Sequence, residues 1–150
     1  MNLSFYAENA ERRCFSERAM EEALSGMGGF IGKRLSDILT LRDISVVRIT
    51  QELLYSTESL DRFLTHENPD IVYHLASYGN HYNQTDSEEM VRSNIIATYH
   101  LYQSIVKNTR ADMVYFSTSS VFLPVQTIYS ITKYAAESML KVVRQQDNRR

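Results

Sequence analysis

Four short runs of apolar and β-branched residues alternate along the chain with segments of helical periodicity. The clearest run is DIVYHLAS (70–77), whose nearly continuous apolar character is expected of a strand that is covered on both faces of a parallel sheet. The other runs are AMEEALSG (19–26), ISVVRIT (44–50) and MVYFSTSSVF (113–122). This alternation predicts an α/β fold with a parallel sheet and helices on both faces.

Helical spacing of apolar residues predicts one helix after each of these strands. The segment 56–69 starts on hydroxyl residues and stops at a proline. The segment 86–108 is predicted as one long helix that opens with a capping box of Asp86 and Glu89. The last helix contains YSITKYAAE (129–137).

Composition and charge narrow the class of protein. With 150 residues, of which 43% are hydrophobic and 23% charged, the chain fits one domain, which we place at residues 20–150 behind an N-terminal extension of residues 1–19. A net charge of -2 gives no reason to expect a nucleic-acid partner, and no apolar run approaches the ~20 residues that span a membrane. A single cysteine, Cys14, and a charged N-terminus favour the cytoplasm. The four histidines show no ligand spacing with this cysteine, so we expect no metal site.

A glycine-rich segment, SGMGGFIG (25–32), lies between the first predicted strand and a clear helix. Gly26, Gly29 and Gly32 have G-x-x-G-x-x-G spacing, and Gly28 adds a further glycine. The first glycine permits a tight turn, the second lets a diphosphate approach the backbone, and the third lets helix and strand pack closely. The following helix points its N-terminal amides at the phosphates. Such a turn is a weak signal alone, and its place between strand and helix gives it weight.

YSITK (129–133) places Tyr129 and Lys133 four positions apart, on one face of the last predicted helix. A phenol ordinarily loses its proton near pH ~10, and a neighbouring ammonium stabilises the phenolate, so such a pair can move a proton at neutral pH. In the structural alternative, Tyr129 packs against its neighbours and Lys133 is a solvated helix residue. The spacing alone does not decide between the two.

Several segments, taken in order, resemble the extended short-chain dehydrogenase/reductase family of NAD(P)-dependent sugar-nucleotide epimerases, dehydratases and reductases. They are GMGGFIG (26–32), PDIVYHLAS (69–77), SNIIATYHLYQS (93–104) and FSTSSVF (116–122) with YSITK (129–133). The resemblance implies a Rossmann-type doubly wound parallel sheet, NAD or NADP as cofactor and a nucleotide-sugar as substrate.

The same resemblance implies roles for single residues. Tyr129 is the expected general acid/base, Lys133 the cation that supports it and holds the nicotinamide ribose, and Thr118 the hydroxyl that binds the reacting substrate oxygen. Asn94 is the helix asparagine that supports the lysine through a water. The cofactor-binding residues implied in this way are Gly26, Gly28, Gly29, Phe30, Ile31, Gly32, Leu75, Ala76, Ser77, Tyr129 and Lys133.

The end of the second predicted strand departs from the family pattern. Thr50 stands where the family has an acidic residue for the adenosine ribose, so selectivity for NAD is not supported. Arg48, or an arginine elsewhere, would tolerate the 2′-phosphate of NADP. The sequence therefore leaves the choice between NAD and NADP open.

The C-terminal half departs further. The segment from Thr118 to Tyr129 is short, which leaves YGNHYNQTD (78–86) as the candidate for lining the substrate side. The chain ends at Arg150, so we expect a fold that is incomplete at its C-terminal side and lacks the substrate lobe. A sheet that stops there has a free edge, which invites a homodimer.

The leading interpretation is an NAD(P)-dependent epimerase- or reductase-type domain that uses a Tyr-Lys pair. One alternative is a non-catalytic remnant that binds a dinucleotide or a protein. Another is a domain whose missing lobe is supplied by a second chain. Binding of a nicotinamide dinucleotide separates the leading interpretation from a remnant that binds only protein.

Overall fold

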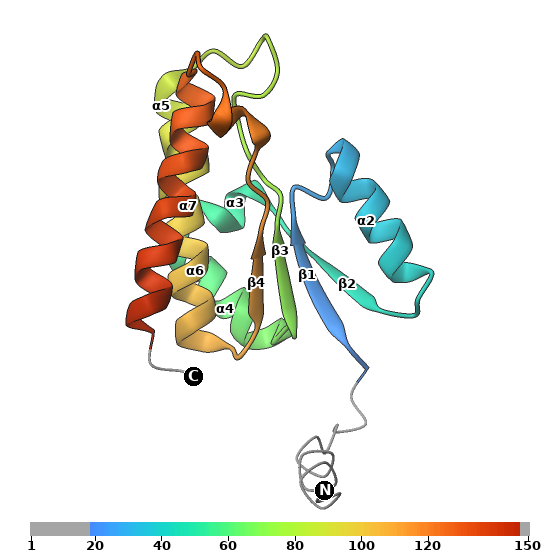
Figure 1. Ribbon diagram of the computed structural model, residues 1–150. Coiled ribbons are helices and arrows are strands. Elements are labelled where there is room, and N and C mark those ends of the chain that lie inside the picture. Colours follow the sequence, from blue (N-terminus) through green and yellow to red (C-terminus); the bar gives the residue numbers. More distant parts are fainter. Residues whose placement is uncertain (1–18, 148–150) are drawn as a thin grey trace, which may run out of the picture.

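The computed structural model describes residues 19–147, so the predicted N-terminal extension lies almost entirely outside the described residues. Four strands form one sheet in the order β2-β1-β3-β4, and all neighbouring strands run parallel. They are β1 (Glu21–Ser25), β2 (Ser45–Ile49), β3 (Ile71–His74) and β4 (Asp112–Tyr115). The predicted α/β class with a parallel sheet is confirmed, as Figure 1 shows.

Helices cover both faces of the sheet, but unevenly. One helix, α2 (Phe30–Thr40), lies against β1 and β2 on one face. Three lie on the other face in Figure 1: α4 (Thr57–Glu67), α6 (Ala97–Asn108) and α7 (Ile128–Gln146). Shorter elements complete the described chain: α3 (Gln51–Leu54), α5 (Ser87–Val91), the π-helix η1 (Arg92–Ile96) and the 3-10 helix η2 (Ser119–Phe122).

The core forms between the sheet and the helices α4 and α6. Ala23 of β1 and Val72 of β3 are fully buried, and so are Leu60 of α4 and Leu101 of α6. Each leucine buried in this way stabilises the fold by ~1.5–3 kcal/mol. The apolar run predicted as a covered strand is therefore β3, at the centre of the sheet.

Local signals set the ends of the helices, as predicted for the segment 56–69. Ser56 caps α4 by accepting a hydrogen bond from a backbone N–H, and Pro69 follows the end of this helix. Thr127 and Ser130 form a capping box at the start of α7. This second cap determines where α7 begins and hence the height at which Tyr129 lies.

The predicted long helix over 86–108 is confirmed in its extent but not in its type. A five-residue π-helix, η1, interrupts it between α5 and α6. The N–H of Ala97 bonds to the carbonyl of Arg92 five residues back, and the hydroxyl of Thr98 donates to the carbonyl of Asn94. Apolar spacing does not report such a one-residue shift, although π-helical turns are frequent at functional sites.

Glu22 is a carboxyl group inside the sheet, where charged residues are unusual. Glu22 is 2% exposed, and it lies in register with Val46 of β2 and Ile71 of β3. Burial raises the pKa of Glu22, a hydrogen bond with Tyr73 opposes this, and the charge of Asp70 adds to it. Its Oε2 atom has no hydrogen-bond partner among the described residues, so this position costs stability.

The strand order determines where a crevice opens. After β1 the chain crosses to β2 on one side, whereas β3 and β4 lie on the other side of β1. The connections at the carboxyl ends of β1 and β3 therefore diverge, which makes this the topological switch point of the sheet. Open parallel sheets bind their ligands at this place.

Candidate functional site

A cavity of about 610 Å³ lies at the switch point, and we call it the crevice. The turn after β1, the end of β2, the segment after β3 and the first turns of α7 line it. The structure brings together here all the residues predicted to bind a cofactor: Gly26, Gly28, Gly29, Phe30, Ile31, Gly32, Leu75, Ala76, Ser77, Tyr129 and Lys133. Two predicted catalytic residues, Asn94 and Thr118, do not line it.

The glycine turn has no room for side chains at two positions. Gly26 has a φ of 74°, and a Cβ atom there would lie 2.6 Å from the backbone nitrogen of Ala76. A Cβ atom on Gly32 would overlap the carbonyl oxygen of Gly26. The turn closes with a 3.0 Å hydrogen bond from the N–H of Gly29 to the same oxygen. The backbone is therefore held close to β3, with Gly28 exposed on top.

The first turn of α2 is open to an anion. Its N-cap is Gly29, which supplies no side-chain hydrogen bond, and the first turn carries no acidic residue. The amides of Phe30 and Ile31 follow directly and line the crevice with their residues. This fits the diphosphate of a dinucleotide, since unpaired amides and the positive end of the helix dipole both favour negative charge.

Lys133 is a buried ammonium at the opposite side of the crevice. The residue is 2% exposed, and its Nζ donates a 2.7 Å hydrogen bond to the carbonyl of Phe116. The same nitrogen lies 4.2 Å from the centre of the Tyr115 ring. Burial lowers the pKa of Lys133 to about 8, although the carboxylate of Glu137 opposes this. A lysine with this burial and this pKa is not a solvated helix residue.

Asn94 connects the loop after β3 to the first turns of α7. Its Nδ2 donates to the carbonyl of Tyr78 at 2.8 Å, and its Oδ1 accepts from the N–H of Tyr78 at 2.9 Å. The same Nδ2 donates to Thr132 Oγ1 at 2.9 Å, and this hydroxyl donates to the carbonyl of Tyr129. Asn94 thus positions the helical turn that carries Tyr129. Its support of the lysine through a water stays a prediction.

His74 is fully buried and joins β3 to β1 and α6. Its Nδ1 lies 2.6 Å from Ser25 Oγ, and its Nε2 lies 2.8 Å from Thr98 Oγ1. Thr98 gives its only proton to the carbonyl of Asn94, so it must accept from Nε2–H, and Nδ1 must accept from Ser25. Ser25 Oγ in turn accepts from the N–H of Ala76. Burial lowers the pKa of His74 to about 3, with a nearby ammonium contributing, so the imidazole is neutral and this chain of hydrogen bonds has one direction.

Thr118 lies outside the crevice. It is the N-cap of η2, where its Oγ1 accepts from the N–H of Ser120 at 3.2 Å. The neighbouring Phe116 and Ser117 line the crevice instead. The role predicted for Thr118 at the substrate oxygen stays a prediction.

A polar cluster near the end of β2 was not predicted from the sequence. Tyr55 donates to the carboxylate of Glu89, and Ser93 donates to the same oxygen at 2.8 Å. Tyr55, Ser93 and Gln51 line the crevice. Asp86 caps α5 as predicted, but the side chain of Glu89 turns to this cluster instead of back to the cap. Only the tertiary fold brings α3 and α5 together, so local sequence carries no signal for the cluster.

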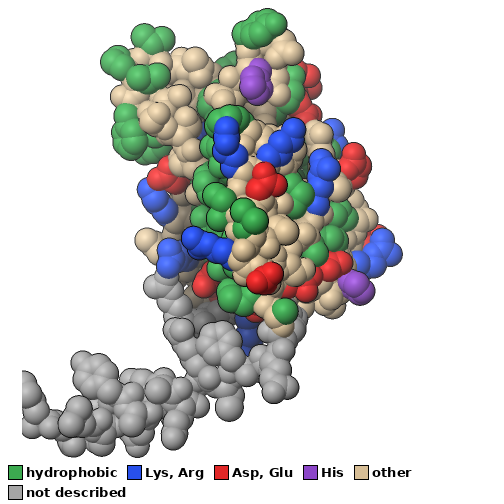
Figure 2. All heavy atoms as spheres, turned by 90° about the vertical axis from the view of Figure 1, so that its right-hand side faces the viewer, with side chains coloured by type: hydrophobic (Ala, Val, Ile, Leu, Met, Phe, Trp, Pro, Cys, Tyr) green, Lys and Arg blue, Asp and Glu red, His purple; other side chains and the backbone are tan. Residues whose placement is uncertain are grey.

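The loop over 78–86, predicted to line the substrate side, borders the crevice with Tyr78, Asn80, His81 and Gln84. In Figure 2, hydrophobic side chains gather at the upper end of the molecule, where this loop and η2 lie. Large exposed apolar residues of these segments are Tyr82, Phe122, Leu123 and Val125. Positive and negative side chains are interspersed over the rest of the face in Figure 2. The mouth of the crevice is thus bordered by apolar surface.

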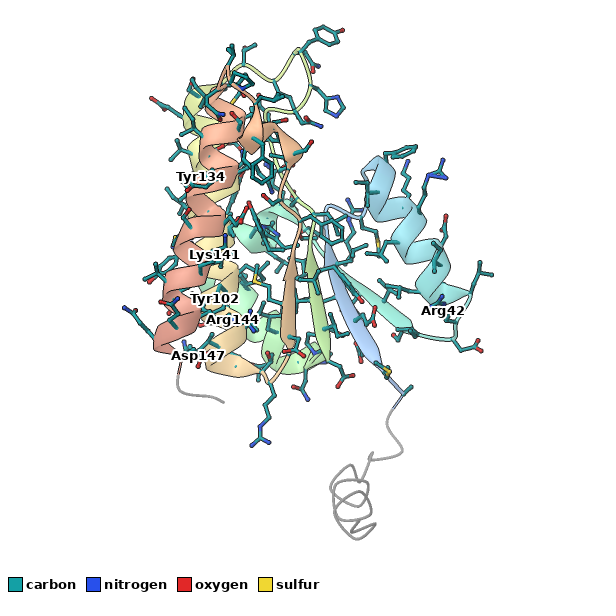
Figure 3. The ribbon with its side chains drawn as sticks, in the orientation of Figure 1. Arg42, Tyr102, Tyr134, Lys141, Arg144 and Asp147 are labelled. Atoms are coloured by element: carbon teal, nitrogen blue, oxygen red, sulfur yellow. The ribbon has the colours of Figure 1, made fainter. Side chains whose placement is uncertain are left out.

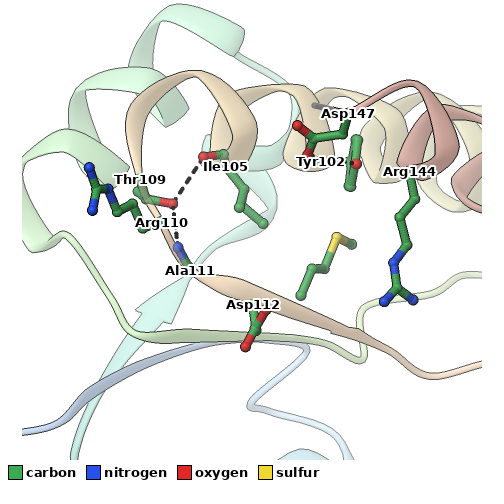
Figure 4. A pocket seen from close by; sticks show the side chains of 9 residues that line it. Tyr102, Ile105, Thr109, Arg110, Ala111, Asp112, Arg144 and Asp147 are labelled. Carbon is green, nitrogen blue, oxygen red and sulfur yellow. Dashed lines mark hydrogen bonds between the residues drawn. The ribbon is translucent and has the colours of Figure 1, made fainter. Parts of the chain in front are cut away.

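A second hollow, of about 880 Å³, lies beside the start of β4, at the end of the sheet opposite to the crevice. We call it the edge groove. Tyr102 of α6 and Arg144 of α7 line it with Asp147, as Figures 3 and 4 show. Thr109 accepts from the N–H of Ala111 and closes the turn that leads into β4. None of the residues predicted to have a function lies in it.

No group of three or more His, Cys, Asp or Glu side chains between residues 19 and 147 is arranged to hold a metal ion. Within the same part of the chain, no helix is both long enough and apolar enough to cross a membrane.

Residues 23–150 match the model of the NAD dependent epimerase/dehydratase family. The structure is similar to that of UDP-glucose 4-epimerase from Thermus thermophilus in complex with NAD, with a TM-score of 0.76 and 19% identity over 85% of this chain and 52% of the other. It is also similar to dTDP-4-dehydrorhamnose reductase from Bacillus anthracis in complex with NADP. Here the TM-score is 0.73, with 20% identity over 85% of this chain and 51% of the other. A third similar structure is UDP-glucuronic acid 4-epimerase from Bacillus cereus in complex with NAD. Its TM-score is 0.72, with 22% identity over 85% of this chain and 53% of the other.

These likenesses establish the fold, and the chain spans about half the length of each of the three proteins. The predicted Rossmann-type doubly wound sheet, incomplete at its C-terminal side, is therefore confirmed. No curated protein matches the sequence.

Proposed function

Because the chain belongs to the NAD-dependent epimerase/dehydratase family, we propose that its crevice binds NAD or NADP and serves oxidation and reduction of a nucleotide-sugar. The observation that carries this proposal is the pairing, in one cavity, of an open glycine turn with the buried ammonium of Lys133. The similar proteins include epimerases in complex with NAD and a reductase in complex with NADP, which supports a nicotinamide dinucleotide as the ligand.

The glycine turn would hold the diphosphate. Gly28 is exposed and Gly29 leaves the first turn of α2 uncapped, so two phosphates can approach the amides of Phe30 and Ile31. The opposite wall, with Tyr129 and Lys133, would then face the nicotinamide end. With the dinucleotide in this orientation, each glycine of the turn serves either the approach of the diphosphate to the backbone or the packing of α2.

Tyr129 would move the proton of the reaction. Bound nicotinamide supplies hydride transfer to or from a sugar carbon. When an alcohol is oxidised, Tyr129 Oη takes the hydroxyl proton as the hydride leaves the same carbon, and in reduction it returns the proton. Lys133 stays fixed by Phe116 and stabilises the phenolate, and Thr118 would approach the substrate oxygen from η2.

Dinucleotide binding is tested with Gly28→Val. A Cβ atom on Gly28 meets only the side chain of Arg48, at 3.7 Å, so the fold accepts this change while the new side chain stands where the diphosphate would lie. We expect NADH and NADPH to bind the unaltered chain and to bind Gly28→Val at least about tenfold more weakly, a loss of ~1.4 kcal/mol. Calorimetry or nicotinamide fluorescence measures the affinity of the unaltered chain and of the variant.

The matched control is Ser45→Val, which places the same valine side chain at an exposed position at the other end of β2, away from the crevice. Its affinity should equal that of the unaltered chain. A folded chain that binds neither dinucleotide refutes the proposal and leaves a protein-binding remnant as the explanation.

Proton transfer is tested with Tyr129→Phe. We expect this variant to bind the dinucleotide within about twofold of the unaltered chain and to lose turnover of a nucleotide-sugar. Tyr134→Phe is the control, because Tyr134 lies on the same helix but does not line the crevice. Unchanged turnover in Tyr129→Phe contradicts the assigned role. A chain that binds the dinucleotide but turns over no nucleotide-sugar is a non-catalytic dinucleotide-binding remnant.

A further inference from the structure

The crevice extends beyond the glycine turn to the end of β2, where Arg48, Thr50 and Gln51 line it. This inference rests on the proposed function. A dinucleotide with its diphosphate at Gly28 and its reactive ring toward Lys133 must direct its other half, the adenosine, toward β2. The side chains at this end therefore face the adenosine ribose.

Arg48 reaches across the glycine turn. Its residue belongs to β2 and is exposed, yet one guanidinium nitrogen lies 3.7 Å from the place that a Cβ atom on Gly28 would occupy. The cation thus stands beside the place proposed for the diphosphate and not on the opposite face of the strand. A guanidinium presents several N–H donors in one plane, a geometry that suits a phosphate group.

No carboxylate competes with Arg48 inside the crevice. The charged residues that line it are Arg48 and Lys133, and no Asp or Glu is among the described residues of its lining. Thr50 directly follows β2 and caps α3 by accepting from the N–H of Leu53. A hydroxyl used in this way offers no charged acceptor to a ribose 2′-hydroxyl.

Glu52 is the acidic residue closest in sequence to this end of the crevice. It is exposed and does not line the cavity. Hydrogen bonds from the hydroxyl of Thr50 and from its own backbone hold the pKa of Glu52 below its usual value, with the charge of Arg48 adding to this. Glu52 is thus held at the start of α3.

We propose that Arg48 binds the 2′-phosphate of NADP and that the crevice prefers NADP(H) to NAD(H). The ligand contributes an extra phosphate dianion at the ribose, and the crevice offers it a guanidinium with no carboxylate in its lining. Arg48 is therefore the residue that sets cofactor specificity.

The test compares NADPH with NADH, and adenosine 2′,5′-bisphosphate with adenosine 5′-monophosphate, by calorimetry. Each pair differs by the 2′-phosphate, and the second pair needs neither the nicotinamide nor a substrate. We expect the unaltered chain to bind the 2′-phosphorylated ligand of each pair at least about tenfold more tightly. Arg48→Gln should reduce this ratio to about one and leave the affinity for NADH unchanged.

Arg42→Gln is the matched control. Arg42 follows α2, is exposed and does not line the crevice, and Figure 3 places it at the end of α2 away from the glycine turn. Arg42→Gln removes the same charge as Arg48→Gln. If the ratio of NADPH to NADH affinity is unchanged in Arg42→Gln, the preference comes from contact with Arg48 and not from net charge.

Two outcomes overturn the inference. Equal loss of NADH and NADPH affinity in Arg48→Gln means that Arg48 holds the diphosphate instead. Equal affinity of the unaltered chain for NADH and NADPH refutes the preference while the proposed function stands. If none of the four ligands binds, the proposed function itself fails.

Discussion

The crevice and the edge groove lie at opposite ends of the same sheet and are built in different ways. The edge groove is the larger, at about 880 Å³ against about 610 Å³ for the crevice. In the crevice, however, the backbone itself excludes side chains at Gly26 and Gly32, and the polar groups behind it have fixed partners. The edge groove is lined by buried residues such as Ile105 and Thr109 together with the exposed side chain of Arg144. Volume alone would therefore not select the hollow that we propose as the site.

The difference follows from the two kinds of boundary of a parallel sheet. The crevice lies where connections diverge at the carboxyl ends of β1 and β3, so loops, strand ends and a helix start converge there. The edge groove lies along β4, which pairs only with β3 among the described residues. The N–H groups of Asp112 and Phe116 bond toward β3, so the alternating groups of Met113 and Tyr115 point to the free edge.

The largest effect that separates the two hollows is expected from Gly26→Val. The new side chain would meet the backbone of Ala76 at 2.6 Å in a left-handed conformation that valine avoids. We expect the free energy of unfolding to fall by ~3 kcal/mol or more, measured by urea denaturation. Gly28→Val, two residues on in the same turn, should cost less than ~1 kcal/mol. Equal costs would mean that the turn is not held against β3.

The second prediction concerns acid. The pKa of His74 is about 3 in the folded chain, below the ordinary value of 6.5, so between these values the unfolded chain binds a proton that the folded chain does not. Stability contributed by the neutral imidazole is thus complete above pH 6.5 and is lost as the pH falls toward 3. The loss is ~1.4 kcal/mol per pH unit in this window.

Urea denaturation at pH 7, 6 and 5 tests this on the intact chain and on His74→Gln. At pH 7 the variant should be less stable by ~1–3 kcal/mol, because it breaks the hydrogen bonds to Ser25 and Thr98. The difference in the free energy of unfolding between the intact chain and His74→Gln should narrow as the pH falls. His66→Gln, at an exposed position of α4, is the control and should keep the slope of the unaltered chain. A constant gap would show that His74 titrates normally in the folded chain.

Much of the crevice could be predicted because its signals are local. Alternating patterns indicated the parallel sheet, and the spacing of Gly26, Gly29 and Gly32 indicated a turn that the structure shows to be crowded. The i, i+4 spacing of Tyr129 and Lys133 places both on the crevice side of α7. In each case the residues that act together are close in sequence or at the ends of adjacent strands.

The remaining features depend on contacts between distant segments. The reach of Arg48 to Gly28, the bonds of Asn94 to Tyr78, and the direction of the hydrogen bonds of His74 each join two elements that only the fold brings together. The edge groove has no sequence signal either, since it is a space between elements. Patterns of residue type report which face of an element is buried, but not how far a side chain reaches across it.

The smallest effect is expected in the edge groove. Arg144 is exposed on α7, and its guanidinium borders the open hollow in Figure 4. Arg144→Gln should change the free energy of unfolding by less than ~0.5 kcal/mol, since substitutions at exposed positions usually alter stability by no more than this. It should also leave the affinity for NADPH as it is, in contrast to Arg48→Gln. A loss of stability above ~1 kcal/mol, or a change in affinity, would show that the groove is organised as firmly as the crevice. The distinction between the crevice and the edge of β4 would then no longer hold.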